Sequence, residues 1–143
     1  MKVIEIAFTA YPVTDMKRAS KFYSETLGLK ESRRWGDDIK AWVEYDIGPG
    51  TLAITNMAGE WKPSSNGGGA GLEVDDFRAA VEGLRKAGVK FVWDPEETPV
   101  CHMALISDPD GNSICIHRRK SSGRARPPGA PRMEGLALSG LKR

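Results

Sequence analysis

A short pattern occurs twice in this chain. Residues 13–19 (VTDMKRA) resemble residues 74–80 (VDDFRAA), and residues 27–30 (LGLK) resemble residues 87–90 (AGVK). Both pairs lie 60 or 61 residues apart. Self-similarity at a fixed spacing is typical of a supersecondary unit that is present in two copies. The repeat constrains the fold strongly, because both halves must form the same elements in the same order.

Each copy carries the signals of a strand, a helix and three further strands. Asp or Thr side chains precede the helical pattern and can accept the first free N–H groups, while Gly28 and Gly88 follow it, where a left-handed cap is favoured. Turns rich in Gly, Asp and Pro separate the last two strands of each copy. The periodicity predicts strands over 3–10, 30–35, 41–46, 51–56, 70–74, 90–93, 102–107 and 113–118, and helices over 16–27 and 77–87.

These elements predict an α+β fold of two βαβββ modules with pseudo-twofold symmetry. A chain of 143 residues has room for one such domain. We place the domain at residues 1–120, with modules at about 1–57 and 69–120, and treat 121–143 as a basic C-terminal extension that contains Pro and Gly. Apolar residues near the end of the extension predict that it packs on its own or a neighbouring subunit.

The composition, with 40% hydrophobic and 28% charged residues, is typical of a soluble globular protein. No apolar run approaches the roughly 20 residues that span a bilayer, and the first residues do not resemble a signal peptide. We therefore expect a cytoplasmic protein that does not bind membranes, with Cys101 and Cys115 unpaired. Residues 1–117 carry 13 basic and 18 acidic side chains, whereas residues 118–143 carry eight and one. The body lacks the basic stripe that nucleic-acid binding needs.

Several motifs resemble those of a known family. Residues 13–15, 22–23 and 27–29 (VTD, FY and LGL) look like the first-module signature of the vicinal oxygen chelate superfamily. Residues 73–76 (EVDD) and 108–112 (DPDGN) look like its second-module signature. This superfamily includes glyoxalases, bleomycin-binding proteins and dioxygenases. The resemblance implies a concave, U-shaped mixed sheet around a groove, a homodimer and, in the enzymes, a divalent metal held by His and Glu side chains.

The resemblance also implies where the four metal ligands would stand. These positions hold Phe8 (or Ala7, if the following turn shifts the strand by one), Ala53, Gly69 and Cys115. None of them is His, Asp or Glu, and a lone thiolate does not suit a hard, oxygen-loving cation. We therefore expect neither a metal nor another cofactor.

The last hairpin defines one side of the expected groove. Side chains alternate between the two faces of a strand, so the turn at 108–112 places Leu105 beside Cys115 and Met103 beside His117 on one face. Gly69 and Gly71 should leave open volume next to this face. The expected ligand-binding residues are Phe8, Trp42, Ala53, Gly69, Met103, Leu105, Cys115 and His117.

Tryptophans leave an alternative open. Trp42 and Trp93 either line the groove, where aromatic rings and an acidic body would favour a planar cation, or fill the core beneath the helices.

Three residues are candidates for catalysis. His117 carries an imidazole, the commonest general acid or base in proteins, Glu73 could act as a base if burial raised its pKa, and Cys115 carries a thiol. The structural alternatives are a His117 bonded to a backbone carbonyl and a Glu73 bonded to backbone or to a basic side chain. A soft-metal site of Cys101, Cys115 and His117 is disfavoured, because about four residue rises separate the two cysteines.

These observations predict a metal-independent small-molecule-binding protein. A glyoxalase-like lyase or isomerase that uses nonstandard groove residues is the alternative. A third is an interaction module whose groove is closed by its own C-terminal extension or by a partner. The expected partners are a small organic ligand and a second copy of the chain.

Overall fold

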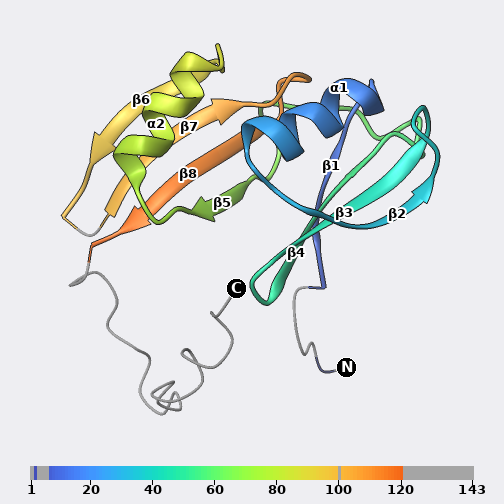
Figure 1. The fold of residues 1–143 in the computed structure, drawn as a ribbon, viewed down its shortest axis with the longest axis horizontal. Helices are drawn as coiled ribbons and strands as arrows, with labels where there is room; N and C mark the ends of the chain where they lie inside the picture. Colours follow the sequence, from blue (N-terminus) through green and yellow to red (C-terminus); the bar gives the residue numbers. More distant parts are fainter. Residues whose placement is uncertain (1, 3–6, 100, 121–143) are drawn as a thin grey trace.

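A computed structural model of the chain describes residues 2, 7–99 and 101–120 and contains two modules of the same plan (Figure 1). The first part of the strand expected at 3–10, and the whole extension at 121–143 with its expected packing, lie outside the described residues.

The modules repeat one sheet topology. Each sheet has four strands, in the orders β1-β4-β3-β2 and β5-β8-β7-β6, and its first strand is parallel to its last while the other pairs are antiparallel. The first module contains β1 (Thr9–Pro12), α1 (Met16–Lys21), the π-helical turn η1 (Phe22–Thr26), β2 (Glu31–Gly36), β3 (Ala41–Ile47) and β4 (Gly50–Thr55). The second contains β5 (Ala70–Glu73), α2 (Phe77–Lys86), β6 (Phe91–Glu97), β7 (Cys101–Ser107) and β8 (Ser113–Arg119).

The expected α+β fold and its two βαβββ modules are confirmed, although the strands form two sheets rather than one continuous sheet. Both helix caps are also confirmed: Asp15 accepts from the Arg18 N–H at 3.0 Å, and Asp76 accepts from the Ala79 N–H at 2.9 Å.

Three elements differ from the prediction. Of the strand expected over 3–10, residues 7 and 8 are not strand, and β1 instead runs over Thr9–Pro12. The helix expected over 16–27 changes after α1 into a π-helix, in which the Leu27 N–H donates to the Phe22 carbonyl five residues earlier at 2.9 Å. Strand β6 continues beyond Trp93, because it is an edge strand with two register shifts that accommodate Pro95.

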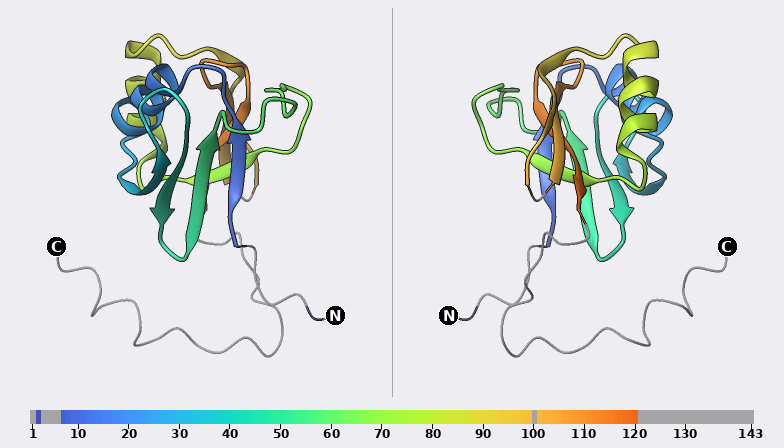
Figure 2. Two further views of the ribbon diagram at one scale, coloured as in Figure 1. Left: turned by 90° about the vertical axis from the view of Figure 1, so that its right-hand side faces the viewer. Right: turned by 90° about the vertical axis from the view of Figure 1, so that its left-hand side faces the viewer.

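Both helices cover the same side of the two sheets, and the segment that connects the modules lies on the other side (Figure 2). Beneath the helices, residues of both modules form a single apolar core. Tyr23 and Tyr45 of the first module and Leu84, Ile106 and Ile114 of the second belong to it. The opposite faces of the sheets, here called the free faces, carry no helix from residues 7–99 or 101–120.

Hydrogen bonds join the modules where β1 ends and β8 begins. The Tyr11 hydroxyl donates to the Ser113 carbonyl at 2.8 Å and accepts from the Ala70 N–H. The Asn112 amide donates to the Pro12 carbonyl at 2.8 Å. No helix in the described part of the chain is long and apolar enough to cross a membrane.

Candidate functional site

Aromatic rings gather on the free face of the first sheet. Phe8 contacts Trp42 edge-to-face, with the ring centroids 5.2 Å apart, and the Trp42 indole N–H donates to Glu44 at 2.9 Å. Trp35 pairs with Trp42 across β2 and β3, so both rings lie on this face, and Trp35 is 51% exposed. Strand alternation could have identified Glu44, two residues after Trp42, as part of this set. The position of Trp35 on this face could not be predicted, because it depends on the register of β2 against β3, which the sequence does not specify.

The free face of the second sheet carries sulfur and apolar side chains. Met103 pairs with His117, and Leu105 pairs with Cys115, as the hairpin prediction required. Trp93 pairs with Leu105 from β6 and is 56% exposed. The alternative that Trp42 and Trp93 fill the core is therefore wrong for both.

Two of the expected ligand-binding residues lie differently from the prediction. Ala53 faces the same way as Glu44 but is fully buried, so neighbouring side chains separate it from any ligand. The space toward which a Cβ of Gly69 would point is closed, because that Cβ would lie 2.9 Å from the Ser113 carbonyl oxygen, although Gly69 itself lines a cleft between the modules. The space at Gly71 is open, because no described atom lies within 4 Å of its would-be Cβ. Gly69 approaches β8 closely because hydrogen bonds join the modules where β1 ends and β8 begins, a contact that we call the seam. No local feature of the sequence predicts this approach.

Glu73 and His117 form a pair on the second free face. Glu73 Oε2 lies 2.5 Å from His117 Nδ1, and Glu73 Oε1 accepts from the Arg119 N–H at 2.7 Å. Burial raises the pKa of Glu73, but these two hydrogen bonds outweigh it, and the pKa lies below its usual value. The hypothesis that burial raises the pKa of Glu73 and makes it a base is therefore wrong. The alternative, in which Glu73 bonds to backbone and to a basic side chain, is confirmed. For His117, the partner is a carboxylate and not the expected backbone carbonyl.

Both cysteines are free thiols, as expected. Cys101 pairs with Arg119 across the hairpin, which places it four residues along β8 from Cys115. Burial, with a smaller effect of Cys101, raises the pKa of the Cys115 thiol. Cys115 is therefore a protonated, apolar group at neutral pH.

The side chains at the four family positions do not fit a divalent metal. Phe8, Ala53 and Gly69 offer no donor, and the Cys115 thiol resists deprotonation. Within residues 2, 7–99 and 101–120, no three His, Cys, Asp or Glu side chains come together as a metal-binding group.

The two larger hollows between the modules are candidate ligand sites. A cleft of about 980 Å³ separates the β3–β4 turn from β5, and Leu52, Gly71, Leu72, Glu73 and Arg119 are among its walls. Its volume is in the range of small-molecule sites.

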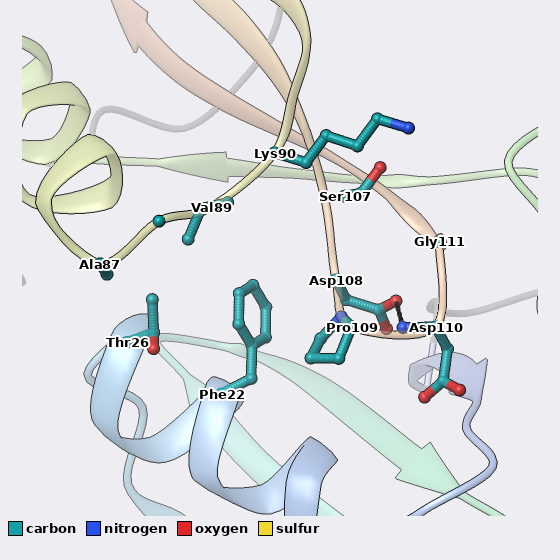
Figure 3. Close-up of a pocket in the computed structure, with 11 residues that line it drawn as sticks. Phe22, Thr26, Ala87, Val89, Lys90, Ser107, Asp108, Pro109, Asp110 and Gly111 are labelled. Carbon is teal, nitrogen blue, oxygen red and sulfur yellow. Dashed lines mark hydrogen bonds between the residues drawn. The ribbon is translucent and has the colours of Figure 1, made fainter.

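The second hollow, of about 570 Å³, lies on the helix side between η1, the end of α2 and the β7–β8 turn (Figure 3). The Phe22 ring projects into it from η1, and the Asp108 carboxylate forms part of its wall. That carboxylate is saturated by the N–H groups of Asp110 and Asn112, the Asn112 amide and the Tyr23 hydroxyl, at 2.8 to 3.0 Å. We therefore regard this hollow as part of the seam between the modules and not as a ligand site.

Comparison with known proteins gives consistent relatives. The profile of the Glyoxalase/Bleomycin resistance protein/Dioxygenase superfamily matches residues 5–116. A glyoxylase-like domain-containing protein of Didymella fabae is 30% identical over 126 residues, which cover 80% of this chain and 94% of that protein. The crystal structure of TnmS3, an antibiotic binding protein from Streptomyces sp. CB03234, superimposes with a TM-score of 0.70 at 27% identity, covering 84% of this chain and 99% of that one. A glyoxalase/bleomycin resistance protein from the same strain gives a TM-score of 0.62 at 29% identity, covering 78% and 98% of the two chains.

Proposed function

The chain belongs to the Glyoxalase/Bleomycin resistance protein/Dioxygenase superfamily, and on that basis we propose that it binds a small planar organic molecule on its free faces without a metal. The observation that carries the proposal is the aromatic cluster of Phe8, Trp35 and Trp42 with the Glu44 carboxylate. Exposed aromatic rings beside a carboxylate favour planar ligands, cationic ones above all. The printed description of TnmS3 as an antibiotic binding protein supports the same class of function.

Two further features of the proposal concern the metal and the assembly. Metal independence is supported by the donor chemistry, since the family positions hold Phe8, Ala53, Gly69 and Cys115. We also propose that the protein is cytoplasmic and forms a homodimer. The half-exposed Trp93 ring on the second free face is the part that a second copy would cover, while the aromatic cluster of the first free face stays open to the ligand.

A glyoxalase-like lyase or isomerase remains the second candidate. One observation favours it, namely the Glu73–His117 pair, which could hold an imidazole as a general base. Turnover of a 2-oxoaldehyde–thiol adduct by the purified protein, and its loss in His117→Phe, would support this candidate over simple binding.

The test of binding is a titration with a planar cationic dye, acridine orange, followed by tryptophan fluorescence. Trp42→Ala should weaken binding about tenfold, because an aromatic anchor carries much of the energy of such a site. Ile39→Ala is the control, since Ile39 is 75% exposed in the turn between β2 and β3. Equal affinity of Trp42→Ala and the wild type would contradict the proposed face.

Metal independence needs a separate measurement. Protein treated with EDTA and shown by elemental analysis to lack Zn, Ni, Mn and Fe should bind the dye with unchanged affinity. Loss of binding after EDTA, with recovery on adding one divalent ion, would overturn the metal-independent assignment.

A further inference from the structure

We propose that the Glu73–His117 pair recognises a hydroxyl group on an aromatic ligand whose ring lies over Gly71. This inference rests on the proposed function, because it assigns the chemical class of a ligand that binds at the second free face. The Glu73–His117 pair lies two residues further along β5 and β8 than the Gly71–Cys115 pair.

The hydrogen-bond pattern determines what His117 can offer a ligand. The lowered pKa of Glu73 keeps its carboxylate ionised, so both of its oxygens are acceptors. Oε1 is held by the Arg119 N–H, and Oε2 faces His117 Nδ1. Nδ1 must therefore carry the hydrogen, and in the neutral imidazole Nε2 is left with a lone pair.

That lone pair is available to a ligand. In the part of the chain that the structure describes, no hydrogen bond reaches His117 Nε2, and the side chain is 26% exposed. An acceptor held in a fixed orientation selects a ligand that donates, which is what a hydroxyl group does and a methyl ether cannot.

The surface beside the pair has the shape for a flat ring. Gly71 pairs with Cys115 just as Glu73 pairs with His117, so the four residues form two adjacent rungs on one face. Space above Gly71 is open to at least 4 Å among the described atoms, and Gly71 and Glu73 both lie on the edge of the cleft of about 980 Å³. On the same face, Leu105 pairs with Cys115 and Met103 pairs with His117, so soft, apolar side chains flank the two rungs.

The experiment compares two probes that differ only in the donor: 7-hydroxycoumarin and 7-methoxycoumarin. The wild-type protein should bind the hydroxyl form about tenfold more tightly than the ether, because the ether leaves Nε2 unpaired. Gly71→Leu should abolish binding of both probes by filling the place of the ring. Gly71 is at an ordinary φ with open space around it, so this variant should fold.

Glu73→Gln gives a sharper test that conserves shape. With its amide oxygen toward the Arg119 N–H, the amide nitrogen faces His117 Nδ1 and donates to it. The imidazole hydrogen then moves to Nε2, which becomes a donor. The tenfold preference for the hydroxyl should fall to about one, while the ether keeps its affinity or gains. A merely structural role of Glu73 would not change the ratio of the two affinities.

Two histidine variants complete the set. His117→Phe removes the acceptor and should also bring the ratio to about one. His102→Phe is the matched control, because His102 faces the helix side, with its ring 5.6 Å from that of Phe77. It should keep the wild-type ratio.

The outcomes separate this inference from the proposed function. If acridine orange binds but the two coumarins bind equally or not at all, the inference is overturned and the proposed function stands. A wild-type ratio retained in Glu73→Gln or in Gly71→Leu also overturns it. If no planar probe binds to the protein, the proposed function fails, and the inference fails with it.

Discussion

Tyr23 lies at the point where the two modules meet. Its fully buried hydroxyl donates to the Asp108 carboxylate at 3.0 Å, across 85 residues of sequence. Burial, together with the charge of Asp108, raises the pKa of Tyr23 far above its usual value. The phenol therefore stays protonated and remains a donor at every pH at which the protein is folded.

Tyr23→Phe should lower the free energy of unfolding by about 1–2 kcal/mol, the net value of a hydrogen bond to a charged acceptor. Asp108 would still accept from Asn112, so the loss should not exceed this range. Urea denaturation measures it. Tyr45→Phe is the matched control, because the equally buried Tyr45 hydroxyl has Ser20 and Ser24 near it but no hydrogen bond of good geometry among the described residues. Equal losses of unfolding free energy in the two variants would mean that the hydrogen bond from Tyr23 to Asp108 does not add to stability.

Glu73 gives a prediction about pH. Its pKa in the folded protein lies below the usual 4.5, so it contributes stability above pH 4.5, and that contribution is lost as the pH falls through the folded pKa. Melting temperatures should thus be higher for the wild type than for Glu73→Gln near neutrality, and the difference should shrink steadily below pH 4.5.

Glu60→Gln, in the segment between the modules, is the control for this pH series. Glu60 makes no hydrogen bond within the described residues, so the variant should follow the wild type at all pH values. A Glu73→Gln difference that stays constant down to low pH would contradict the assigned ionisation.

How far the site could be predicted from sequence depended on the range of each contact. The hairpin of β7 and β8 is local, and its turn set the pairing of Leu105 with Cys115 and of Met103 with His117 correctly. The Glu73–His117 contact joins residues 44 positions apart on parallel strands, and no local rule specifies that register. The sequence therefore predicted the face on which Glu73 and His117 lie, but not their contact or the lowered pKa of Glu73.

At the scale of elements, the two helices end in the same way. Gly28 and Gly88 have φ values of 69° and 72°, in the left-handed region, as their place in the repeat predicted. The π-helical η1 was not predictable, because its extra residue leaves the apolar spacing of a helix nearly unchanged. Buried Phe22 and Tyr23 at its start suggest that packing on the shared core, and not local propensity, selects it.

Two glycines of the second helical segment should respond in opposite directions to alanine. Gly88→Ala places a Cβ at a φ of 72° and should destabilise the protein by about 1 kcal/mol. Gly83 lies inside α2, with no described atom within 4 Å of an added Cβ, so Gly83→Ala should stabilise it by about 0.5–1 kcal/mol. Thermal unfolding of the two variants beside the wild type checks both signs. If both variants changed the melting temperature in the same direction, helix α2 would not end at Gly88 in the left-handed conformation that the structure shows.

At the scale of the molecule, the repeat does not produce two independent halves. Each module has only a four-stranded sheet and one helical segment, and the core beneath the helices takes residues from both. Most of the exposed aromatic rings among the described residues lie on the free faces, whereas the buried apolar residues that both modules share lie on the helix side.

Because the two modules share one core, they should unfold together. Asn112 is 1% exposed, donates to the Pro12 carbonyl and to Asp108 at 2.8 Å each, and accepts from the Ser64 N–H at 3.2 Å. It thus joins the first module, the connecting segment and the second module. Wild-type protein should unfold in urea in one transition, with the same midpoint by tryptophan fluorescence and by circular dichroism.

Asn112→Ala should keep that single transition but lower the free energy of unfolding by about 2–3 kcal/mol, since it removes the hydrogen bonds to the Pro12 carbonyl and from the Ser64 N–H, and one of the four donors to the Asp108 carboxylate. The exposed Asn66→Ala, in the connecting segment, is the control and should change stability little. If the two probes gave different midpoints in the wild type, or if Asn112→Ala split the transition in two, the modules would be separate folding units. The seam of hydrogen bonds and the common core would then be too weak to couple them.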